Sequence, residues 1–399
     1  MPLTFHDDCK VLQIIDTLGM GGAETWLMEV LRRSVNSGLR IDFLCTSGQQ
    51  GIFDEEAQLL GAKVFYIPFG KRKLASFSKR FRQILAAEKY DALHDHQDYS
   101  GGWHFLLGTG LLPRTRITHV HNPSYQIRDN YGLTTSRRLT AKVGKELVRR
   151  FATHLCGTSR QALTAYGFDG PQFRSIPKTV LHCGFSTGRF LGDPQQARAE
   201  LCAEFNWPSD SRIILFAGRI DRSVDPSDPQ AHKNAPFAVQ VGIECLRRDE
   251  RARLLLAGAP SAATPALQER IRAAGASGKI VLAGIRRDIE RLMLAAHALL
   301  FPSREEGLGM VAVEAQASGL PVVASTGVPR ECCVIPDLVD FLPLAEGPQP
   351  WAVKVLERIT QVRRHPAENN ARIAASAFSI EQSKRQMLEL YSGQIGFSQ

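Results

Sequence analysis

The sequence predicts an α/β protein with two doubly wound, Rossmann-like domains. The chain has 399 residues and is 44% hydrophobic, enough for two or three cores at about 150 residues per domain. Short apolar runs alternate with longer amphipathic ones, which is the pattern of βαβ units and parallel sheets. Glycine and proline interrupt this alternation at residues 186–196, after which it resumes.

The first half predicts an N-terminal domain over residues 1–188. "VLQII" (11–15) is typical of a buried strand, and "AETWLMEVLRR" (23–33) places its apolar residues on one face of a helix. Further strands are expected at "IDFLC", "KVFYIP", "DALHDH" and "RITHVH".

The second half predicts a C-terminal domain over residues 189–378. Its strand-like runs are "RIILFAGR", "RLLLAGA", "KIVLAG", "ALLFPS" and "PVVAS". A last helix is expected at about 379–394, because Ser379 and Gln382 form a capping box before an apolar face. Since ligands of open α/β sheets bind beyond the carboxyl ends of the strands, the loops after the strands should carry any chemistry.

The net charge of +9 is concentrated in two segments. Two segments, "KRKLASFSKRFR" (71–82) and "RRLTAKVGKELVRR" (137–150), each carry six Lys or Arg, and only the second contains an acid. The rest of the chain is therefore slightly acidic. Leu74, Phe77 and Phe81 have helical spacing, which suits a basic amphipathic surface on an anionic membrane. A solvated helix face that also covers core is the alternative. We find no nucleic-acid-binding motif.

The sequence disfavours secreted, membrane-spanning and zinc-binding proteins. The N-terminus lacks the pattern of a secretory signal, and no apolar run approaches the roughly 18 residues of a membrane span. The eight cysteines have no zinc-site spacing, which favours reduced thiols and a cytoplasmic protein.

A glycine loop, "DTLGMGGAE" (16–24), joins the first strand to the first helix. A dinucleotide fingerprint would have a third glycine where this chain has Glu24, so a standard dinucleotide site is disfavoured. Bare backbone amides at a helix start favour an anion or a closely approaching sugar. A plain tight turn is the alternative.

Cationic residues follow another strand. Arg219 ends "LFAGR" (215–219), and Lys233 lies in "HKN" (232–234). A guanidinium and an ammonium at a strand end suit phosphate binding, with surface ion pairing as the alternative.

The richest stretch is "SREEGLGMVAVEAQASGLP" (303–321). A helix through both glycines would be unfavourable, so we expect Glu306 in a loop and Glu314 in the early turns of a helix. The N–H groups of residues 307–310 can then hold an anion. A carboxylate can accept hydrogen bonds from two vicinal hydroxyls, so the stretch describes a site for a nucleotide sugar.

Glu306 and Glu314 match the E-x7-E motif of retaining glycosyltransferases. With "GMGGAETWLMEVLRR", "HVHN" and "FPSREEGLGMVAVEAQASGLPVVAS", the chain resembles the GT-B enzymes of group 1, or glycosyltransferase family 4, and within them the bacterial exopolysaccharide type. The resemblance implies two Rossmann-like domains that face a central cleft, with the acceptor on the N-terminal domain and the nucleotide sugar on the C-terminal one. It also implies that the last helix packs back on the N-terminal domain.

The resemblance also implies roles for individual residues. Glu306 would contact the donor sugar and Glu314 the ribose hydroxyls, while Arg219 and Lys233 would neutralise the diphosphate. The thirteen residues between Arg219 and Lys233 are more than the family usually has, and this loop could cover the donor phosphates. The backbone amides at the distal phosphate would be those of Gly307, Leu308, Gly309 and Met310, and Arg286 would also lie in the nucleotide-sugar site. Gly21 and Gly22 would line the cleft. His121 (or else His119) would lie by the sugar, and His96 on the acceptor side.

The expected activity is transfer of a hexosyl group from a nucleotide sugar, UDP in preference to GDP, to a saccharide or lipid-linked saccharide in bacterial surface polysaccharide biosynthesis. The chain has no D-x-D motif, so we expect neither a metal nor a cofactor, and attack from the front face requires no protein nucleophile. The expected location is cytoplasmic, at the inner face of the plasma membrane if the basic segments bind lipid. A nucleotide-sugar 2-epimerase, a phosphorylase and a non-enzymatic basic membrane-binding protein are the alternatives.

Overall fold

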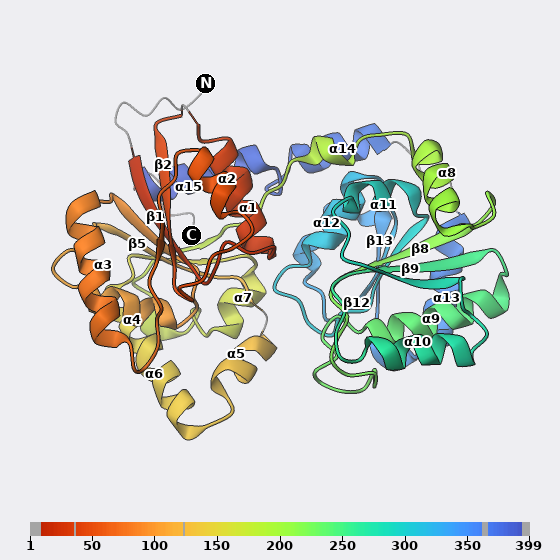
Figure 1. Ribbon diagram of the computed structural model, residues 1–399, viewed down its shortest axis with the longest axis horizontal. Coiled ribbons are helices and arrows are strands. Elements are labelled where there is room, and N and C mark those ends of the chain that lie inside the picture. Colours follow the sequence, from red (N-terminus) through yellow and green to blue (C-terminus); the bar gives the residue numbers. More distant parts are fainter. Residues whose placement is uncertain (1–8, 36, 123, 361–365, 393–399) are drawn as a thin grey trace. The chain divides into compact units, whose positions relative to one another are not determined.

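The computed structural model describes residues 9–35, 37–122, 124–360 and 366–392. The chain divides into two compact units, residues 1–185 with 377–399 and residues 186–376. Each unit is built around a parallel β-sheet with helices on both faces (Figure 1). This architecture confirms the predicted fold class of two doubly wound, Rossmann-like domains.

The N-terminal unit contains, in its described part, a seven-stranded sheet of order β3-β2-β1-β4-β5-β6-β7. The strand order reverses between β1 and β4, which makes the carboxyl ends of these strands the topological switch point. The strands are β1 (Cys9–Ile15), β2 (Leu39–Cys45), β3 (Val64–Tyr66), β4 (Ala92–Asp95), β5 (Thr115–Val120), β6 (His154–Gly157) and β7 (Lys178–Val180).

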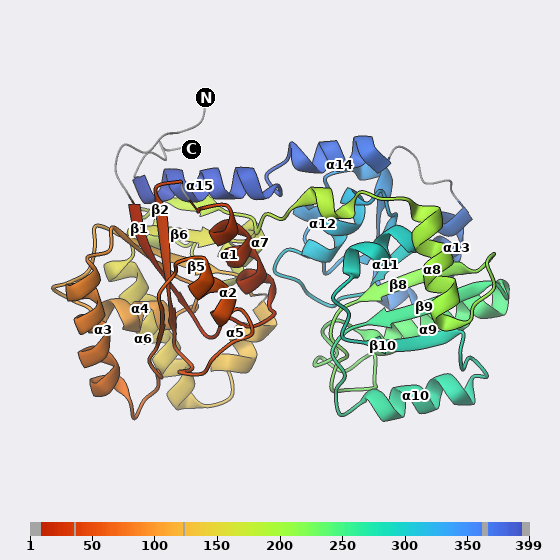
Figure 2. The same ribbon diagram turned by 45° about the horizontal axis from the view of Figure 1, so that its top comes forward.

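Different helices pack on the two faces of this sheet. On one face α3 and α6 both contact α4, and their aromatic and aliphatic side chains form a continuous core with the sheet. On the other face α15, from the end of the chain, contacts both α1 and β1 (Figures 1 and 2). The helices are α1 (Gly22–Arg32), α2 (Asp54–Leu59), α3 (Leu74–Glu88), α4 (Ser100–Leu107), α5 (Ser124–Tyr131), α6 (Thr135–Phe151), α7 (Arg160–Ala165) and α15 (Ile380–Ser392).

Side-chain hydrogen bonds fix α15 in this position. Trp26 of α1 donates from Nε1 to Oγ of Ser383, at 2.8 Å. Ser379 Oγ accepts the N–H of Gln382 at 3.2 Å, which satisfies one of the free amides at the start of α15. The last helix in the described ranges, α15, is therefore part of the N-terminal unit.

The C-terminal unit contains, among the described residues, a six-stranded sheet of order β10-β9-β8-β11-β12-β13, whose switch point lies between β8 and β11. Its strands are β8 (Arg212–Ala217), β9 (Ala252–Ala257), β10 (Ile280–Gly284), β11 (Ala298–Phe301), β12 (Val322–Ser325) and β13 (Val339–Leu342). Its helices are α8 (Pro194–Phe205), α9 (Ala235–Arg248), α10 (Thr264–Ala273), α11 (Ile289–Ala295), α12 (Met310–Ala317), α13 (Pro348–Thr360) and α14 (Pro366–Ala374).

The first basic segment forms α3 and buries its apolar residues. Phe77, Phe81 and Leu85 are buried, and each such side chain stabilises the fold by roughly 2 kcal/mol. The charged ends of Lys79 and Arg80 are exposed. The apolar face of α3 therefore belongs to the protein core, and only its basic face is available to a partner.

Candidate functional site

The glycine-broken stretch after β11 forms a loop followed by a helix, as the sequence predicts. Gly309 is the N-cap of α12 and has φ 88°, in the left-handed region that favours glycine. A Cβ at this position would lie 2.8 Å from Cγ1 of Val328. Only glycine fits here without strain, and its conformation turns the chain into α12 so that the first amides of the helix have no partner within it.

Glu306 lies in this loop and is paired with Lys233. Glu306 is 8% exposed, and its Oε1 lies 2.6 Å from Nζ of Lys233. The backbone N–H of Glu306 donates to the carbonyl of Gly327 at 3.2 Å, which anchors the loop to the neighbouring turn. A carboxylate and an ammonium are thus held together just before the amide-lined start of α12.

Asp221 explains how Lys233 reaches this place. The buried carboxylate of Asp221 accepts the N–H of Lys233 at 3.0 Å and that of Ala235 at 3.1 Å. These bonds close the base of the loop 220–232 and cap the start of α9. A Cβ on Gly218 would lie 3.6 Å from Cγ of Lys233, so the Lys233 stem runs along the backbone just before Arg219. Despite the length of this loop, the Lys233 stem lies beside the residue that precedes Arg219.

The loop 220–232 is fastened to the unit. Arg270 donates to the carbonyl of Val224 at 2.5 Å, and Arg304 donates from its side chain to the carbonyl of Pro226. The N–H of Arg304 donates to the carbonyl of His232 at 2.8 Å. The loop is therefore a fixed flank of the segment that carries Glu306.

Glu314 lies in α12 and is half-buried. Its carboxylate makes no hydrogen bond or ion pair with any residue in the described ranges. Burial raises the pKa of Glu314 to about 7; the charge of Arg189 acts against the shift and that of Glu290 adds to it. A poorly solvated, unpaired carboxylate is ready to accept hydrogen bonds from a ligand.

The two arginines assigned to the donor site differ in their surroundings. Arg219 follows β8, is exposed, and makes no side-chain hydrogen bond or ion pair within the described parts of the chain. Arg286 follows β10 and binds Asp288 through two bonds of 2.8 Å, with Glu204 as a second partner. The hydrogen bond from Arg286 also holds the pKa of Asp288 well below its usual range. Arg219 is free to meet a phosphate, whereas a phosphate would compete with two carboxylates for Arg286.

The glycine loop of the N-terminal unit leads into α1. Gly21 is the N-cap of α1, in an extended conformation, and a Cβ there would lie 2.1 Å from Oε2 of Glu24. A Cβ on Gly22 would meet nothing within 4 Å. Glu24, which occupies the position of the third glycine in a dinucleotide fingerprint, therefore folds its side chain back over Gly21. Gly22 is the more open of the two glycines.

The register of β4 and β5 gathers four histidines on one face of the sheet. His94 pairs with Ile117 and Asp95 with Thr118, and side chains alternate between faces along a strand. "HDH" therefore directs His94 and His96, and "HVH" directs His119 and His121, toward α1 and α15. Burial, the largest cause in each case, lowers the pKa of all four rings, that of His121 to about 3, so they are neutral near pH 7.

His121 and His96, both assigned from the sequence, contact each other directly. Nδ1 of His96 lies 2.8 Å from Nε2 of His121. His121 follows β5 and is half-buried, whereas His119 is fully buried. Sequence reasoning missed the other partners of this cluster, Gln13 and Tyr391. The repeated H-x-H pattern could have revealed the four rings but not these two.

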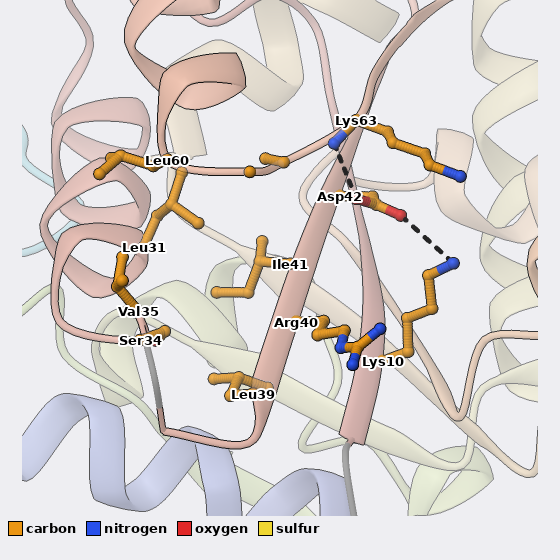
Figure 3. Close-up of a pocket in the computed structure, with 12 residues that line it drawn as sticks. Lys10, Leu31, Ser34, Val35, Leu39, Arg40, Ile41, Asp42, Leu60 and Lys63 are labelled. Atoms are coloured by element: carbon orange, nitrogen blue, oxygen red, sulfur yellow. Dashed lines mark hydrogen bonds and ion pairs between the residues drawn. The ribbon is translucent and has the colours of Figure 1, made fainter.

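Figure 3 shows a pocket at the opposite, amino-terminal ends of the strands of this sheet. Its charges are already paired. Asp42 accepts the N–H of Lys63 at 2.8 Å and lies 3.7 Å from Nζ of Lys10, and both lysines bind Glu88. This pocket shares no residue with the loops described above.

No helix in the described ranges is both long and apolar enough to cross a bilayer.

Comparison with known proteins identifies the family. Residues 211–359 match the family model "Glycosyl transferases group 1", and residues 20–180 match "Glycosyltransferase Family 4". Among curated relatives, the putative glycosyltransferase EpsF of Bacillus subtilis is 26% identical over 96% of both chains. The capsular polysaccharide biosynthesis glycosyltransferase CapH of Staphylococcus aureus is 22% identical over 96% of this chain and 98% of its own.

Solved structures show the same fold. Anabaena HepE in complex with UDP has a TM-score of 0.75 at 18% identity and covers 97% of this chain and 100% of its own. Sucrose-phosphate synthase from Thermosynechococcus elongatus also has a TM-score of 0.75, at 20% identity, with 97% and 99% covered. These likenesses establish the GT-B fold. The chain therefore belongs to the group 1 glycosyltransferases of the GT-B fold, with an N-terminal domain of glycosyltransferase family 4.

Proposed function

We propose that this protein is a retaining glycosyltransferase that moves a hexosyl group from a UDP-sugar to a saccharide or lipid-linked saccharide in bacterial surface polysaccharide biosynthesis. The observation that carries the proposal is the Glu306–Lys233 pair at the amide-lined start of α12. The capsular polysaccharide role of CapH supports the process, and the UDP and UDP-glucose complexes of HepE support the donor.

The proposed donor site lies along the start of α12. The unpaired Glu314 carboxylate accepts hydrogen bonds from the two ribose hydroxyls. The amides of Gly307, Leu308, Gly309 and Met310 hold the distal phosphate, because the amino end of a helix favours an anion. Arg219, which is free, binds the diphosphate, while Arg286 supports the site with most of its charge already neutralised.

Lys233 and Glu306 exchange partners in this proposal. Without donor, the Lys233 ammonium neutralises the Glu306 carboxylate at 2.6 Å. When a nucleotide sugar binds, the ammonium turns to the phosphate and the carboxylate accepts hydrogen bonds from the sugar hydroxyls. The ammonium compensates the carboxylate before binding, and the sugar hydroxyls solvate it afterwards. Both interactions lower the desolvation cost of an 8% exposed carboxylate.

The reaction follows from where charge develops. The bond between the anomeric carbon and the diphosphate oxygen breaks, and the acceptor oxygen bonds to the same face of that carbon. The acceptor proton passes to the departing phosphate oxygen. Arg219, Lys233 and the α12 amides stabilise the growing negative charge on the diphosphate. The neutral His121 ring is assigned to the sugar, and Gly21 and Gly22 to the donor side of the N-terminal unit.

We assign the acceptor, including the His96 side, to the N-terminal unit, and we propose that its basic surface meets an anionic membrane. The basic surface is defined by residues 71–82 and 137–150. Nζ of Lys71 hydrogen-bonds Oγ of Ser136, the residue just before the second segment, which brings the two segments together. Leu139 in α6 is 61% exposed between basic neighbours, so cationic and apolar groups face solvent together, as a lipid surface requires.

Vesicle co-sedimentation tests the membrane proposal. The protein should bind phosphatidylglycerol vesicles at low salt and bind weakly at high salt, because the attraction is screened. Replacing Lys71, Arg72 and Lys73 by Gln should weaken binding more than replacing Arg247 and Arg248, exposed basic residues of the other unit. Binding that is absent at low salt, or equal in both variants, would remove the membrane from the proposal.

A product analysis tests the activity. The protein is mixed with UDP-glucose, UDP-galactose or UDP-N-acetylglucosamine and a saccharide acceptor, and the anomeric signals are followed by proton NMR. The account expects a new glycosidic bond with the configuration of the donor. A 2-epimerase would change the donor with no acceptor present, a phosphorylase would require inorganic phosphate, and a non-enzymatic protein would leave every signal unchanged.

A further inference from the structure

One unbroken run of hydrogen bonds crosses the interior of the N-terminal unit. It connects β1, β4, β5 and α15, and it includes residues up to 378 positions apart in the chain. Every ring nitrogen of its four histidines has a partner except Nε2 of His119, within the described part of the chain. Its members are Gln13, His94, His96, His119, His121, Cys183 and Tyr391.

The orientation of the Gln13 side-chain amide fixes the positions of the protons in one branch. Each neutral imidazole carries one N–H and one bare nitrogen. Oε1 of Gln13 accepts from Nε2 of His96 at 2.9 Å, so Nδ1 of His96 is bare. That nitrogen must accept from Nε2 of His121, at 2.8 Å. Nδ1 of His121 is then bare, and it faces Sγ of Cys183 at 3.7 Å, which can supply a weak S–H donor.

The second branch runs through the last helix. Nε2 of Gln13 donates to the Tyr391 hydroxyl at 2.9 Å, and that hydroxyl donates to Nδ1 of His94 at 2.8 Å. His94 then donates from Nε2 to Nδ1 of His119 at 3.1 Å. This branch of the hydrogen-bond run ends on an N–H at Nε2 of His119.

The reverse direction is less favourable. If the Gln13 amide were turned over, each proton in the hydrogen-bond run would move to the other atom of its bond. Nε2 of His119 would then become a bare acceptor. That atom is fully buried and has no donor nearby among the described residues, while the backbone of Leu181 interacts favourably with a protonated His119 ring. A buried nitrogen with no partner costs about 1–3 kcal/mol in either state, so it is the Leu181 backbone, which interacts favourably with the protonated ring, that favours the first direction.

We propose that Tyr391 and Gln13 are positioning residues that set the donor-to-acceptor direction of this run of hydrogen bonds. They thereby hold His121 in one tautomer, with N–H at Nε2 and a bare Nδ1. The proposal rests on the proposed function, in which His121 lies by the transferring sugar. Hydrogen bonds at both nitrogens fix the orientation of the ring, and burial lowers its pKa and keeps it neutral near pH 7. The last helix thus contributes to the site from 270 positions beyond His121 in the sequence.

A bound cation is the competing explanation of the cluster. Ring nitrogens of His94, His96 and His119 lie within 4.8 Å of one another, which a divalent metal could use. We favour the hydrogen-bonded chain, because a metal at these nitrogens would displace the bond between His94 and His119 and require N–H groups on the outer sides of the rings. Nδ1–H of His94 would then donate to Tyr391, and the Tyr391 hydroxyl would need a turned-over Gln13 amide as its acceptor.

The wild-type protein tests the tautomer directly. The full chain is labelled with 15N-histidine, and long-range proton–nitrogen spectra at pH 7.5 separate protonated from bare ring nitrogens. His121 is assigned by its loss in His121→Gln. The account expects a protonated Nε2 and a bare Nδ1 at His121. A protonated Nδ1 there, or one equivalent of zinc in the purified protein by elemental analysis, would overturn it.

Tyr391→Phe tests the role of the last helix. It should change the His121 nitrogen shifts and lower kcat by about fivefold to tenfold, the factor that corresponds to one ordinary hydrogen bond, with KM for the donor nearly unchanged. Tyr90→Phe is the control, because Tyr90 is also buried and donates to Asp42 at 2.7 Å near the opposite end of β4. Unchanged spectra and kcat in Tyr391→Phe, or equal changes in both variants, would contradict the proposal.

The spectra do not depend on turnover. If the wild type transfers no sugar, the proposed function fails, and the nitrogen shifts of His121 still decide the tautomer. If Tyr391→Phe does not fold, Gln13→Met removes the same junction, and the same changes in shifts and kcat are expected.

Discussion

Nζ of Lys233 lies 2.6 Å from Oε1 of Glu306, across 73 positions of sequence. This pair joins the base of a long loop to the start of α12, and Asp221 holds the lysine in place through two backbone N–H groups. It places a cation where a leaving diphosphate would gain charge and a carboxylate where a sugar would present hydroxyls.

Removing the cation should affect turnover more than stability. Lys233→Ala should lower kcat by about 100- to 1,000-fold, the usual loss when one stabilising donor is deleted from a transition state. Steady-state kinetics with UDP release measures the effect. Lys354→Ala, which breaks a pair with Glu357 on the surface of the same unit, should leave kcat unchanged. Equal activity in Lys233→Ala and wild type would remove Lys233 from the site.

The raised pKa of Glu314 predicts a pH dependence of nucleotide binding. With a pKa of about 7, the carboxylate is largely protonated at pH 6 and ionised at pH 8. Only the ionised form accepts hydrogen bonds with both oxygens, so the affinity for UDP should rise between these pH values. Calorimetric titrations of UDP into wild type and Glu314→Gln separate this effect from the titration of UDP itself. An identical pH dependence in both proteins would contradict the prediction.

The same shift predicts a gain of stability when the charge is removed. Because the folded pKa is above the unfolded value, the ionised carboxylate destabilises the fold. This cost begins as pH rises through the unfolded pKa near 4.5 and is complete above about 7. Glu314→Gln should therefore raise Tm relative to wild type at pH 8 and change it little at pH 4.5. A Tm difference that does not grow with pH would show that Glu314 is not strained by burial.

The two arginines should separate binding from stability. Arg219→Ala should weaken UDP binding by about 10- to 100-fold, the range for a hydrogen bond to a charged group. Arg286→Ala should weaken it much less but lower Tm, because Asp288 and Glu204 lose one of their two shared partners and keep only Arg291. UDP titration and thermal melts on both variants make the comparison. The opposite order of binding losses would place the diphosphate near Arg286.

Gly309→Ala should disrupt the start of α12. The new Cβ would combine a left-handed backbone with a contact of 2.8 Å to Val328, so we expect a loss of about 1–3 kcal/mol in stability and of UDP binding. Gly275→Ala is the matched control, since φ there is 65° and a Cβ would meet nothing within 4 Å. Equal losses in the two variants would mean that backbone strain alone, and not this turn, is responsible.

The sequence predicted the architecture because most strands are short, continuous apolar runs between amphipathic helices. It missed β6, β7 and β13, "HLCG", "KTV" and "VDFL", because none of them has the continuous apolar run that marks strands of similar length such as β11 and β12. Pairing with a neighbouring strand, and not local preference, makes these segments strands.

The site was partly visible in the sequence. Glu306, Glu314 and Arg219 lie in a recognisable motif or directly after a strand. The environment of Lys233 was not visible, because it depends on Asp221, a single carboxylate twelve positions earlier. The neutral histidines depend on strand register and on Tyr391, and both are set only when distant parts of the chain pack together.

Release of nucleoside diphosphate tests the central claim most directly. Wild-type protein, Glu306→Ala and the neighbouring variant Glu305→Ala are each incubated with UDP-glucose, UDP-galactose or UDP-N-acetylglucosamine and a saccharide acceptor, and UDP is measured over time. The account predicts release by wild type and by Glu305→Ala with at least one donor, and a loss of roughly 100-fold or more in Glu306→Ala. Release by Glu306→Ala at the wild-type rate would contradict the account.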